Sequence, residues 1–139
     1  MFDHVGFVIR SAEISIPFFE ACLAPLGLKV VQRQPKFNAA IFAGKDELPF
    51  LWVGVGDGTF HGVKVEVGKC PMHLAFVAPS KKAVDDFYQI GLRSGGRDNG
   101  APEDCGDGYY AAYLLDPDGN NIEAGFRQKP KSWSPTRSA

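Results

Sequence analysis

Few residues of this sequence have both a side chain and a sequence environment suited to metal binding or proton transfer. The 139 residues include only three histidines, which are His4, His61 and His73. His4 lies in an apolar run near the start, FDHVGFVI, and His73 lies in a similar run, MHLAFVA. Glu123 stands in a third such run, NIEA, where burial of its carboxylate is costly without a cation or a hydrogen-bond donor. Imidazole nitrogens and carboxylate oxygens are ligands typical of divalent transition metals.

An internal repeat relates two of the histidines. A shift of 69 residues places His4 on His73. The same shift superposes further pairs along the next segment, namely Phe7 and Phe76, Ser11 and Ser80, Phe18 and Phe87, and Gly27 and Gly96. Such a run of matches indicates a duplicated structural unit. His4 and His73 are therefore expected on equivalent strands, where together with Glu123 they form a candidate divalent-metal site.

Each of these residues also has a purely structural interpretation. A lone histidine in a strand often packs or forms hydrogen bonds without binding metal, and Glu123 can be an exposed residue of an alternating strand. His61 lies in a glycine-rich connector and is interpreted as exposed. The three cysteines, Cys22, Cys70 and Cys105, are widely spaced and form no CxxC pair, which argues against a disulfide framework and a thiolate zinc site. Cys105 also lacks a basic sequence neighbour that would activate its thiol.

Local patterns place the candidate residues on two β-α-β-β-β units. Residues 2–9 predict a strand, and the helix that follows has Ser11 as its N-cap and Gly27 at its C-terminal end. Three short apolar runs come next and are typical of strands. The second half repeats this order, with Ser80 as helix N-cap and a DPDGNN turn before the last strand. GGRDNG is interpreted as a turn, and GAPEDC as an acidic loop before Tyr109.

Length and composition indicate one ordinary domain, with 45% hydrophobic and 22% charged residues. We expect a single domain built of half-module 1–56, connector 57–70, half-module 71–128 and tail 129–139. A formal net charge of -1 provides no basic field for a nucleic acid. No apolar run is long enough to cross a membrane, and the first residues lack the pattern of a signal peptide. The expected protein is cytoplasmic, with neither nucleic acid nor membrane as a partner.

The sequence resembles the vicinal oxygen chelate superfamily, which includes glyoxalases, bleomycin- and fosfomycin-resistance proteins and extradiol dioxygenases. The resemblance runs from DHVGFVI through HLAFVAPS to YYAAYLLDPDGNNIEA, nearly the whole chain. It implies an α+β, glyoxalase-like fold in which two paired βαβββ modules form a cup-shaped mixed sheet, usually completed in a homodimer. It also implies a divalent metal ion, Fe, Mn, Zn or Ni, on the inner surface. The residues that match its ligands are His4, His73 and Glu123.

The resemblance implies a metal-dependent enzyme, of lyase or dioxygenase type, that acts on a small oxygen-chelating substrate. Glu123 is then a candidate catalytic base, and Tyr109 or Tyr110 can present a hydroxyl to the cup, with Tyr109 taken as the candidate. Lactoylglutathione lyase-like members carry a second carboxylate in the last strand of the first module. Here the repeat register places Leu51 at that position, or Trp52 after a slip of one residue, and neither can bind a metal ion.

A metal-free protein that sequesters a ligand, as bleomycin-resistance members do, is the alternative function. A third interpretation makes the histidines and Glu123 remnants of an ancestral site. Some aromatic side chains of the first half, if they line the cup, would suit an apolar or aromatic ligand, the candidates being Phe37, Phe42, Phe50, Trp52 and Phe60.

Overall fold

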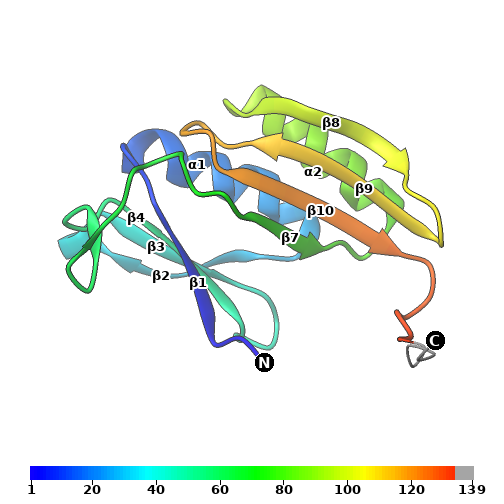
Figure 1. Cartoon of the computed structure of the whole chain (residues 1–139), viewed down its shortest axis with the longest axis horizontal. Helices are drawn as coiled ribbons and strands as arrows, with labels where there is room; N and C mark the ends of the chain where they lie inside the picture. Colours follow the sequence, from blue (N-terminus) through cyan, green and yellow to red (C-terminus); the bar gives the residue numbers. More distant parts are fainter. Residues whose placement is uncertain (134–139) are drawn as a thin grey trace, which may run out of the picture.

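The computed structural model, shown in Figure 1, describes residues 1–133 and contains two units with the same order of elements. The first unit consists of β1 (His4–Val8), α1 (Ala12–Leu23), β2 (Lys29–Gln34), β3 (Ala39–Ala43) and β4 (Phe50–Gly54). The second consists of β7 (His73–Val77), α2 (Lys81–Arg93), β8 (Arg97–Asp104), β9 (Tyr109–Leu115) and β10 (Asn121–Arg127). Short 3-10 helices, η1 (Ala24–Leu26) and η2 (Pro35–Phe37), follow α1 and β2. The predicted α+β fold of two βαβββ modules is confirmed.

The strands of each module form a separate four-stranded mixed sheet. Their spatial orders are β1-β4-β3-β2 and β7-β10-β9-β8, so both modules have the same topology. In each sheet the first strand runs parallel to the last, and the remaining pairs are antiparallel. The first and last strands of each module therefore lie side by side. These are the strands on which the sequence placed its candidate ligands.

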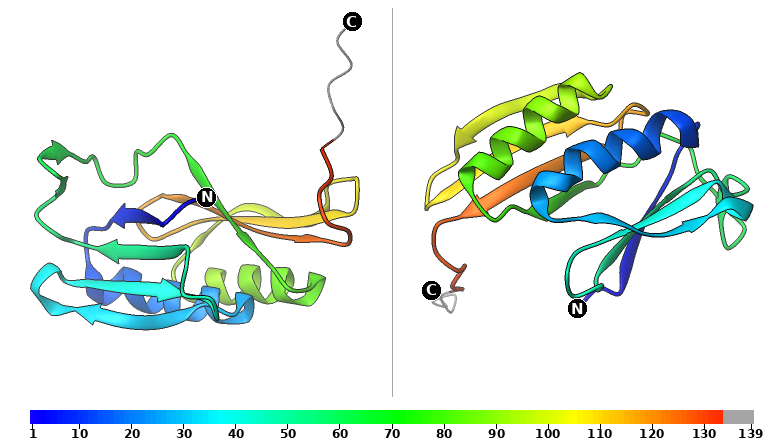
Figure 2. Two further views of the ribbon diagram at one scale, coloured as in Figure 1. Left: turned by 90° about the horizontal axis from the view of Figure 1, so that it is seen from below. Right: turned by 180° about the vertical axis from the view of Figure 1, so that it is seen from behind.

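Both helices cover the same side of the molecule. The right view of Figure 2 is from behind and shows α1 and α2 next to each other in front of the sheets. In Figure 1 no helix of residues 1–133 covers the opposite sheet faces. The core between helices and sheets is apolar and largely aromatic; its fully buried members include Phe18, Phe19, Cys22, Phe42, Val53, Val84, Phe87, Leu114 and Ile122. Burial of these side chains holds the sheets to the helices. The uncovered faces remain available for a functional site.

The helix ends follow the predicted residues, with one difference. The Ser80 hydroxyl accepts a hydrogen bond from the Ala83 amide and caps α2 as expected. Gly27 ends η1 with φ at 83°, a left-handed conformation that favours glycine. Ser11 precedes α1, but its hydroxyl donates to Glu13 and no backbone amide donates to it. None of the helices in residues 1–133 is both long and apolar enough to span a membrane.

Strand β8 corrects the interpretation of residues 97–104 as a turn and a loop. Asp98 and Asn99 lie within β8, and the loop before β9 is confined to residues 105–108. The strand was missed because its sequence, RDNGAPED, combines glycine, proline and acidic residues, all of low β propensity. It lies at the edge of its sheet, and its pairing with β9 shifts register twice. Edge strands with bulges tolerate such residues because one side of the strand needs no partner.

A polar junction ties the connector to both modules. The connector carries a small hairpin of β5 (Thr59–Phe60) and β6 (Val63–Lys64). The Arg10 guanidinium donates to Asp118 Oδ1 and to the Val67 carbonyl, each at 3.1 Å, and the Arg10 amide donates to Asp118 Oδ2. Arg10 follows β1, and Asp118 lies in the turn before β10. Of the predicted tail, residues 134–139 lie outside the described residues.

Candidate functional site

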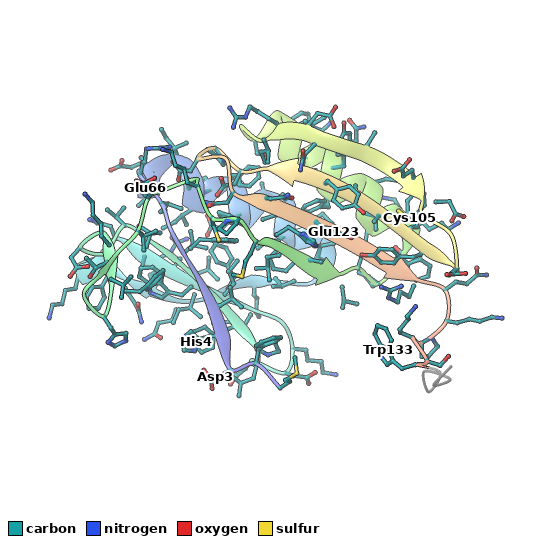
Figure 3. The ribbon with its side chains drawn as sticks, viewed as in Figure 1. Asp3, His4, Glu66, Cys105, Glu123 and Trp133 are labelled. Carbon is teal, nitrogen blue, oxygen red and sulfur yellow. The ribbon has the colours of Figure 1, made fainter. Side chains whose placement is uncertain are left out.

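Two of the three predicted ligands meet on the uncovered face of the second sheet. β7 and β10 are parallel neighbours, and His73 is in register with Asn121. Side chains alternate between the faces of a strand, so Glu123 shares a face with Asn121 and His73. His73 Nε2 lies 3.5 Å from Glu123 Oε2. Figure 3 shows Glu123 near the middle of β10, within the sheet rather than at its edge.

Glu123 is buried, and a phenol partly satisfies its carboxylate. Only 5% of the residue is exposed to solvent, and Tyr109 on β9 donates a hydrogen bond to Oε1. Burial raises the pKa of the Tyr109 phenol above its ordinary value, and the hydrogen bond and negative charge of Glu123 raise it further. Tyr109 is therefore protonated at neutral pH and remains a donor to the carboxylate. The predicted residues Glu123 and Tyr109 are in direct contact.

Two residues that the sequence did not single out hold Tyr109 in place. Gly125 lies beneath its ring, since a Cβ at that position would come within 2.0 Å of the Tyr109 hydroxyl oxygen. The Arg127 guanidinium carbon lies over the ring, 3.9 Å from its centre, as in a cation–π contact. The neighbouring Tyr110 points to the other side of the sheet and donates to Asp85 of α2 at 2.7 Å. Strand alternation thus selects Tyr109 over Tyr110.

Tyr113 is a further phenol on this face. It is in register with Glu123 across β9 and β10. Burial, followed by the charge of Glu123, raises the pKa of Tyr113 to about 12. Its hydroxyl oxygen lies 4.0 Å from the Sγ of Cys105, which is exposed. The alternation Tyr109, Ala111, Tyr113 in the sequence was the signal that could have identified this residue.

His4 occupies the corresponding strand of the first module. Its Nδ1 lies 2.6 Å from Asp3 Oδ1, and its ring stacks on Phe50 with a centroid separation of 4.7 Å. A carboxylate only accepts hydrogen bonds, so Nδ1 carries the proton and Nε2 points away from Asp3. His4 and Glu123 lie in different modules (Figure 3). Within residues 1–133, no three histidine, cysteine, aspartate or glutamate side chains come together to hold one ion.

The structure decides which residue of the first module corresponds to Glu123. His4 pairs with Phe50 in the first sheet as His73 pairs with Asn121 in the second. Two residues further along their strands, Trp52 and Glu123 are therefore equivalent. The repeat register that placed Leu51 there is wrong by one residue, because the loop before β4 differs in length from the turn before β10. Leu51 is buried in the core instead.

The uncovered face of the first sheet is hollowed. An open cavity of about 1360 Å³ lies there, lined by His4 and by aromatic side chains from several elements, namely Phe37, Phe50, Trp52 and Phe60. Phe42, the remaining aromatic candidate, is buried in the core. His61 is exposed and also borders the cavity, whereas His73 and Glu123 do not. A single chain thus presents an aromatic cavity on one sheet and a histidine–carboxylate pair on the other.

The sequence and the fold are similar to those of known proteins. The family described as the Glyoxalase/Bleomycin resistance protein/Dioxygenase superfamily matches residues 1–124. A glyoxalase/bleomycin resistance protein from Albidiferax ferrireducens T118 has 29% identity and a TM-score of 0.74, over 91% of this chain and 99% of its own. A glyoxalase-related enzyme from Fulvimarina pelagi has 20% identity and a TM-score of 0.73, over 91% and 88%.

A third solved structure carries the name of a specific enzyme. Lactoylglutathione lyase from Agrobacterium tumefaciens has 17% identity and a TM-score of 0.64, over 91% of this chain and 92% of its own. At such an identity the likeness concerns the fold alone. No curated protein matches the sequence.

Proposed function

We propose, from the premise that this chain belongs to the Glyoxalase/Bleomycin resistance protein/Dioxygenase superfamily, that it is a divalent-metal-dependent enzyme of the lyase or dioxygenase type. Its substrate is a small molecule with oxygen atoms that can chelate the ion. The observation that carries the proposal is the close approach of His73 to the buried carboxylate of Glu123. The proposed location is the cytoplasm.

The donor groups present suit Fe, Mn, Zn or Ni. An imidazole Nε2 and a carboxylate oxygen 3.5 Å apart are separated about as two ligands of one ion are, given metal–ligand bonds of ~2.0–2.2 Å. The Tyr109 hydroxyl binds the other carboxylate oxygen and fixes the orientation of the group, as outer partners of metal ligands do. The pair therefore supplies two of the three proposed ligands, His73 and Glu123.

His4 is the proposed third ligand and is contributed by a second copy of the chain. Asp3 holds its Nδ1 proton, which leaves Nε2 of the neutral ring as the coordinating atom. Its face of the first sheet and the face that carries Glu123 are both free of helices. In a twofold dimer, each first module can face the second module of the other copy, giving two equivalent sites.

Exposed apolar side chains support this homodimer. Val77 is 84% exposed on the same face of β7 as His73, and Phe2, Phe37 and Met72 at the cavity of the first module are also exposed. Apolar side chains gathered on uncovered sheet faces are characteristic of subunit interfaces. Among the strands of residues 1–133, β1 and β7 are in addition edge strands, with backbone groups on one side that no neighbouring strand pairs.

The residues of the chain have distinct roles in such a site. An ion held by His73, Glu123 and the second copy's His4 would supply Lewis-acid polarisation of the substrate oxygens or a centre for O₂. Glu123 accepts a proton from the substrate, and Tyr109, whose phenol stays protonated, donates to the carboxylate and keeps it in position. The aromatic side chains around Trp52 exclude water from the opposite wall of the site.

Metal content tests the proposal. We expect protein purified without chelator to retain a divalent ion, and His4→Ala, His73→Ala and Glu123→Gln to lower the affinity for that ion. His61→Ala is the matched control, because His61 is exposed and belongs to no ligand set. Wild-type protein that takes up no stoichiometric Fe, Mn, Zn or Ni would overturn the proposal.

Subunit mixing tests the division of the site between copies. Heterodimers of His4→Ala with Glu123→Gln keep one intact site, so they should regain about half of the wild-type metal sites. Each parent homodimer should bind weakly. If the heterodimers bind no better than their parents, the ligands do not come from two chains.

A metal-free, ligand-sequestering protein is the second candidate. The observation that favours it is the aromatic cavity combined with Trp52 in place of a carboxylate. Under this function the His73 and Glu123 variants would bind an organic ligand as tightly as wild type, because neither residue lines the cavity. Loss of ligand binding on removal of a bound ion would exclude it.

A further inference from the structure

The cavity of the first module has aromatic walls built from separate elements. His4 of β1 stacks on Phe50 of β4 with their ring planes 9° apart. Trp52 of β4 meets Phe60 of the connector edge to face, with centroids 5.8 Å apart. Each pair joins residues of two different strands. Flat rings arranged in this way offer faces and edges on which another ring can stack.

Glycine brings the connector close to the sheet. A Cβ on Gly6 would lie 3.1 Å from the Phe60 ring, so a larger residue there would push Phe60 away from the sheet. The Trp52 indole is held by a 2.9 Å hydrogen bond from its Nε1 to Gln34 Oε1. Trp52 is only half-buried, and its ring borders the cavity. The aromatic wall is thus fixed in position before any ligand enters.

Lysines predominate among the charged groups of the cavity. Three lysines and two carboxylates line it, and Lys69 is paired with Glu66 at 3.3 Å. The other carboxylate, Asp57, accepts hydrogen bonds from Thr59. Lys36 and Lys64 are exposed, and neither has a carboxylate within 4.0 Å among the described residues. Two ammonium groups are therefore available to an anionic ligand.

We infer that this cavity binds a planar aromatic ligand with a carboxylate or similar anionic oxygen group. The inference rests on the proposed function, because the ligand would occupy the same site and supply the oxygen atoms that the metal chelates. The ring lies against Trp52, and Lys36 and Lys64 attract the anionic group. Pockets of ~300–1,000 Å³ hold drug-sized ligands, so the cavity has room for a fused ring and for the face of a second copy.

Three small probes separate the contributions of planarity and charge. 2-Naphthoate is planar and anionic, decahydro-2-naphthoate is anionic without an aromatic ring, and 2-naphthamide is planar and neutral. We expect 2-naphthoate to bind with the lowest Kd in calorimetric titration. Loss of either property should raise the Kd about five- to tenfold, the effect of one good aromatic or charged contact. Equal Kd values for 2-naphthoate and its saturated analogue would overturn the inference.

The two tryptophans permit a residue-level readout. Their indole N–H groups give separate NMR signals, and Trp133→Phe identifies the signal of Trp133, which is exposed near the C-terminal end (Figure 3). We expect 2-naphthoate to shift the Trp52 signal and not that of Trp133. A Trp52 signal that stays unchanged at saturating 2-naphthoate would contradict the proposed site.

Variants complete the test. Trp52→Leu should weaken 2-naphthoate binding about tenfold, whereas Trp52→Phe keeps a ring and should weaken it less. Lys36→Gln and Lys64→Gln change exposed side chains, so they should fold even if Trp52→Leu does not. They should weaken 2-naphthoate and leave 2-naphthamide unaffected. Unchanged affinity for 2-naphthoate in Trp52→Leu, or in both lysine variants, would overturn the inference.

Metal analysis of the same samples separates the two proposals. Binding of 2-naphthoate at Trp52 by protein that takes up no ion would support the aromatic-acid site and refute the metal-dependent function. Uptake of the ion without any binding of 2-naphthoate would refute the aromatic-acid site alone.

Discussion

Trp52 of the first module and Glu123 of the second occupy the same position in two sheets of identical topology. Each lies two residues beyond the residue paired with a histidine, Phe50 with His4 and Asn121 with His73. The two copies of the repeated unit therefore differ at this position: the first sheet carries an indole there, and the second sheet carries a carboxylate. In the proposed site, the first module supplies aromatic side chains together with His4, and the second supplies His73 and Glu123.

The equivalence predicts the effect of adding a carboxylate to the first module. In the proposed dimer, Trp52→Glu places a fourth ligand opposite His73 and Glu123. We expect the affinity for the divalent ion to rise about tenfold, which corresponds to ~1.4 kcal/mol, in competition with a chelating dye. Leu51→Glu is the matched control, because Leu51 is 3% exposed and faces the helices. It should destabilise the fold by several kcal/mol, on the order of the cost of burying a charge, without a gain in metal affinity.

Removal of the Tyr109 hydroxyl should destabilise the protein. Tyr109→Phe leaves the buried Glu123 carboxylate without its phenol donor, and a hydrogen bond to a charged group contributes about 1.5–3 kcal/mol. We expect a loss of this size in the free energy of unfolding measured with urea. Tyr110→Phe removes a similar bond, to Asp85 on the helix side. Because Asp85 is less buried than Glu123, the control should lose less; equal losses would refute the special role of Tyr109.

A side chain at Gly125 should destabilise the protein because it would clash with Tyr109, and removal of the Tyr109 ring should relieve that clash. The Cβ of Gly125→Ala would lie 2.0 Å from the Tyr109 hydroxyl oxygen and 2.4 Å from its ring carbons. We expect a loss of about 1–3 kcal/mol, as for other overpacked sites. In the Tyr109→Ala background the same change should cost little, since the clashing atoms are gone. A double-mutant cycle measures this coupling, and additive losses would show that the contact with Tyr109 is not the cause.

The tyrosines predict how stability depends on pH. All four, Tyr88, Tyr109, Tyr110 and Tyr113, have a raised pKa in the folded state. The folded protein therefore holds these protons more tightly than the unfolded chain, whose phenols titrate near pH 10. Their contribution to stability is fully present below about pH 10 and is lost as the pH rises above it. Phenolate absorbance should appear at higher pH in native protein than in urea, and coincident titrations would disprove this.

Arg10 should stabilise the connector more than the core. Arg10→Ala removes the hydrogen bonds to Asp118 and to the Val67 carbonyl. We expect amides of residues 57–70 to lose about 1–2 kcal/mol of protection against hydrogen exchange, while β9 and β10 keep theirs. Arg10→Lys keeps the charge but not the two-pronged guanidinium, so it should recover only part of the protection. Full protection in Arg10→Ala would show that the junction does not hold the connector.

Much of the fold could be predicted because its signals are local or repeated. The apolar runs around His4 and His73, the cap at Ser80 and the DPDGNN turn each reflect a few neighbouring residues. In the turn, Asp116 accepts hydrogen bonds from the Asp118 and Asn120 amides, as its side-chain type predicts. Strand β8 was not predicted, because an edge strand with bulges shows little alternation of apolar and polar residues.

The sequence by itself determined the duplicated βαβββ architecture and the equivalence of His4 and His73. The spacing of apolar residues and the 69-residue repeat can both be read directly from the order of residues. Only the tertiary structure decided that Trp52 rather than Leu51 matches Glu123, because strand register depends on loop length and on which face packs against the helices. It also decided that Tyr109 reaches Glu123 over Gly125 and that His4 lies apart from them. Such relationships join different strands and modules, so their distances depend on how the whole chain packs.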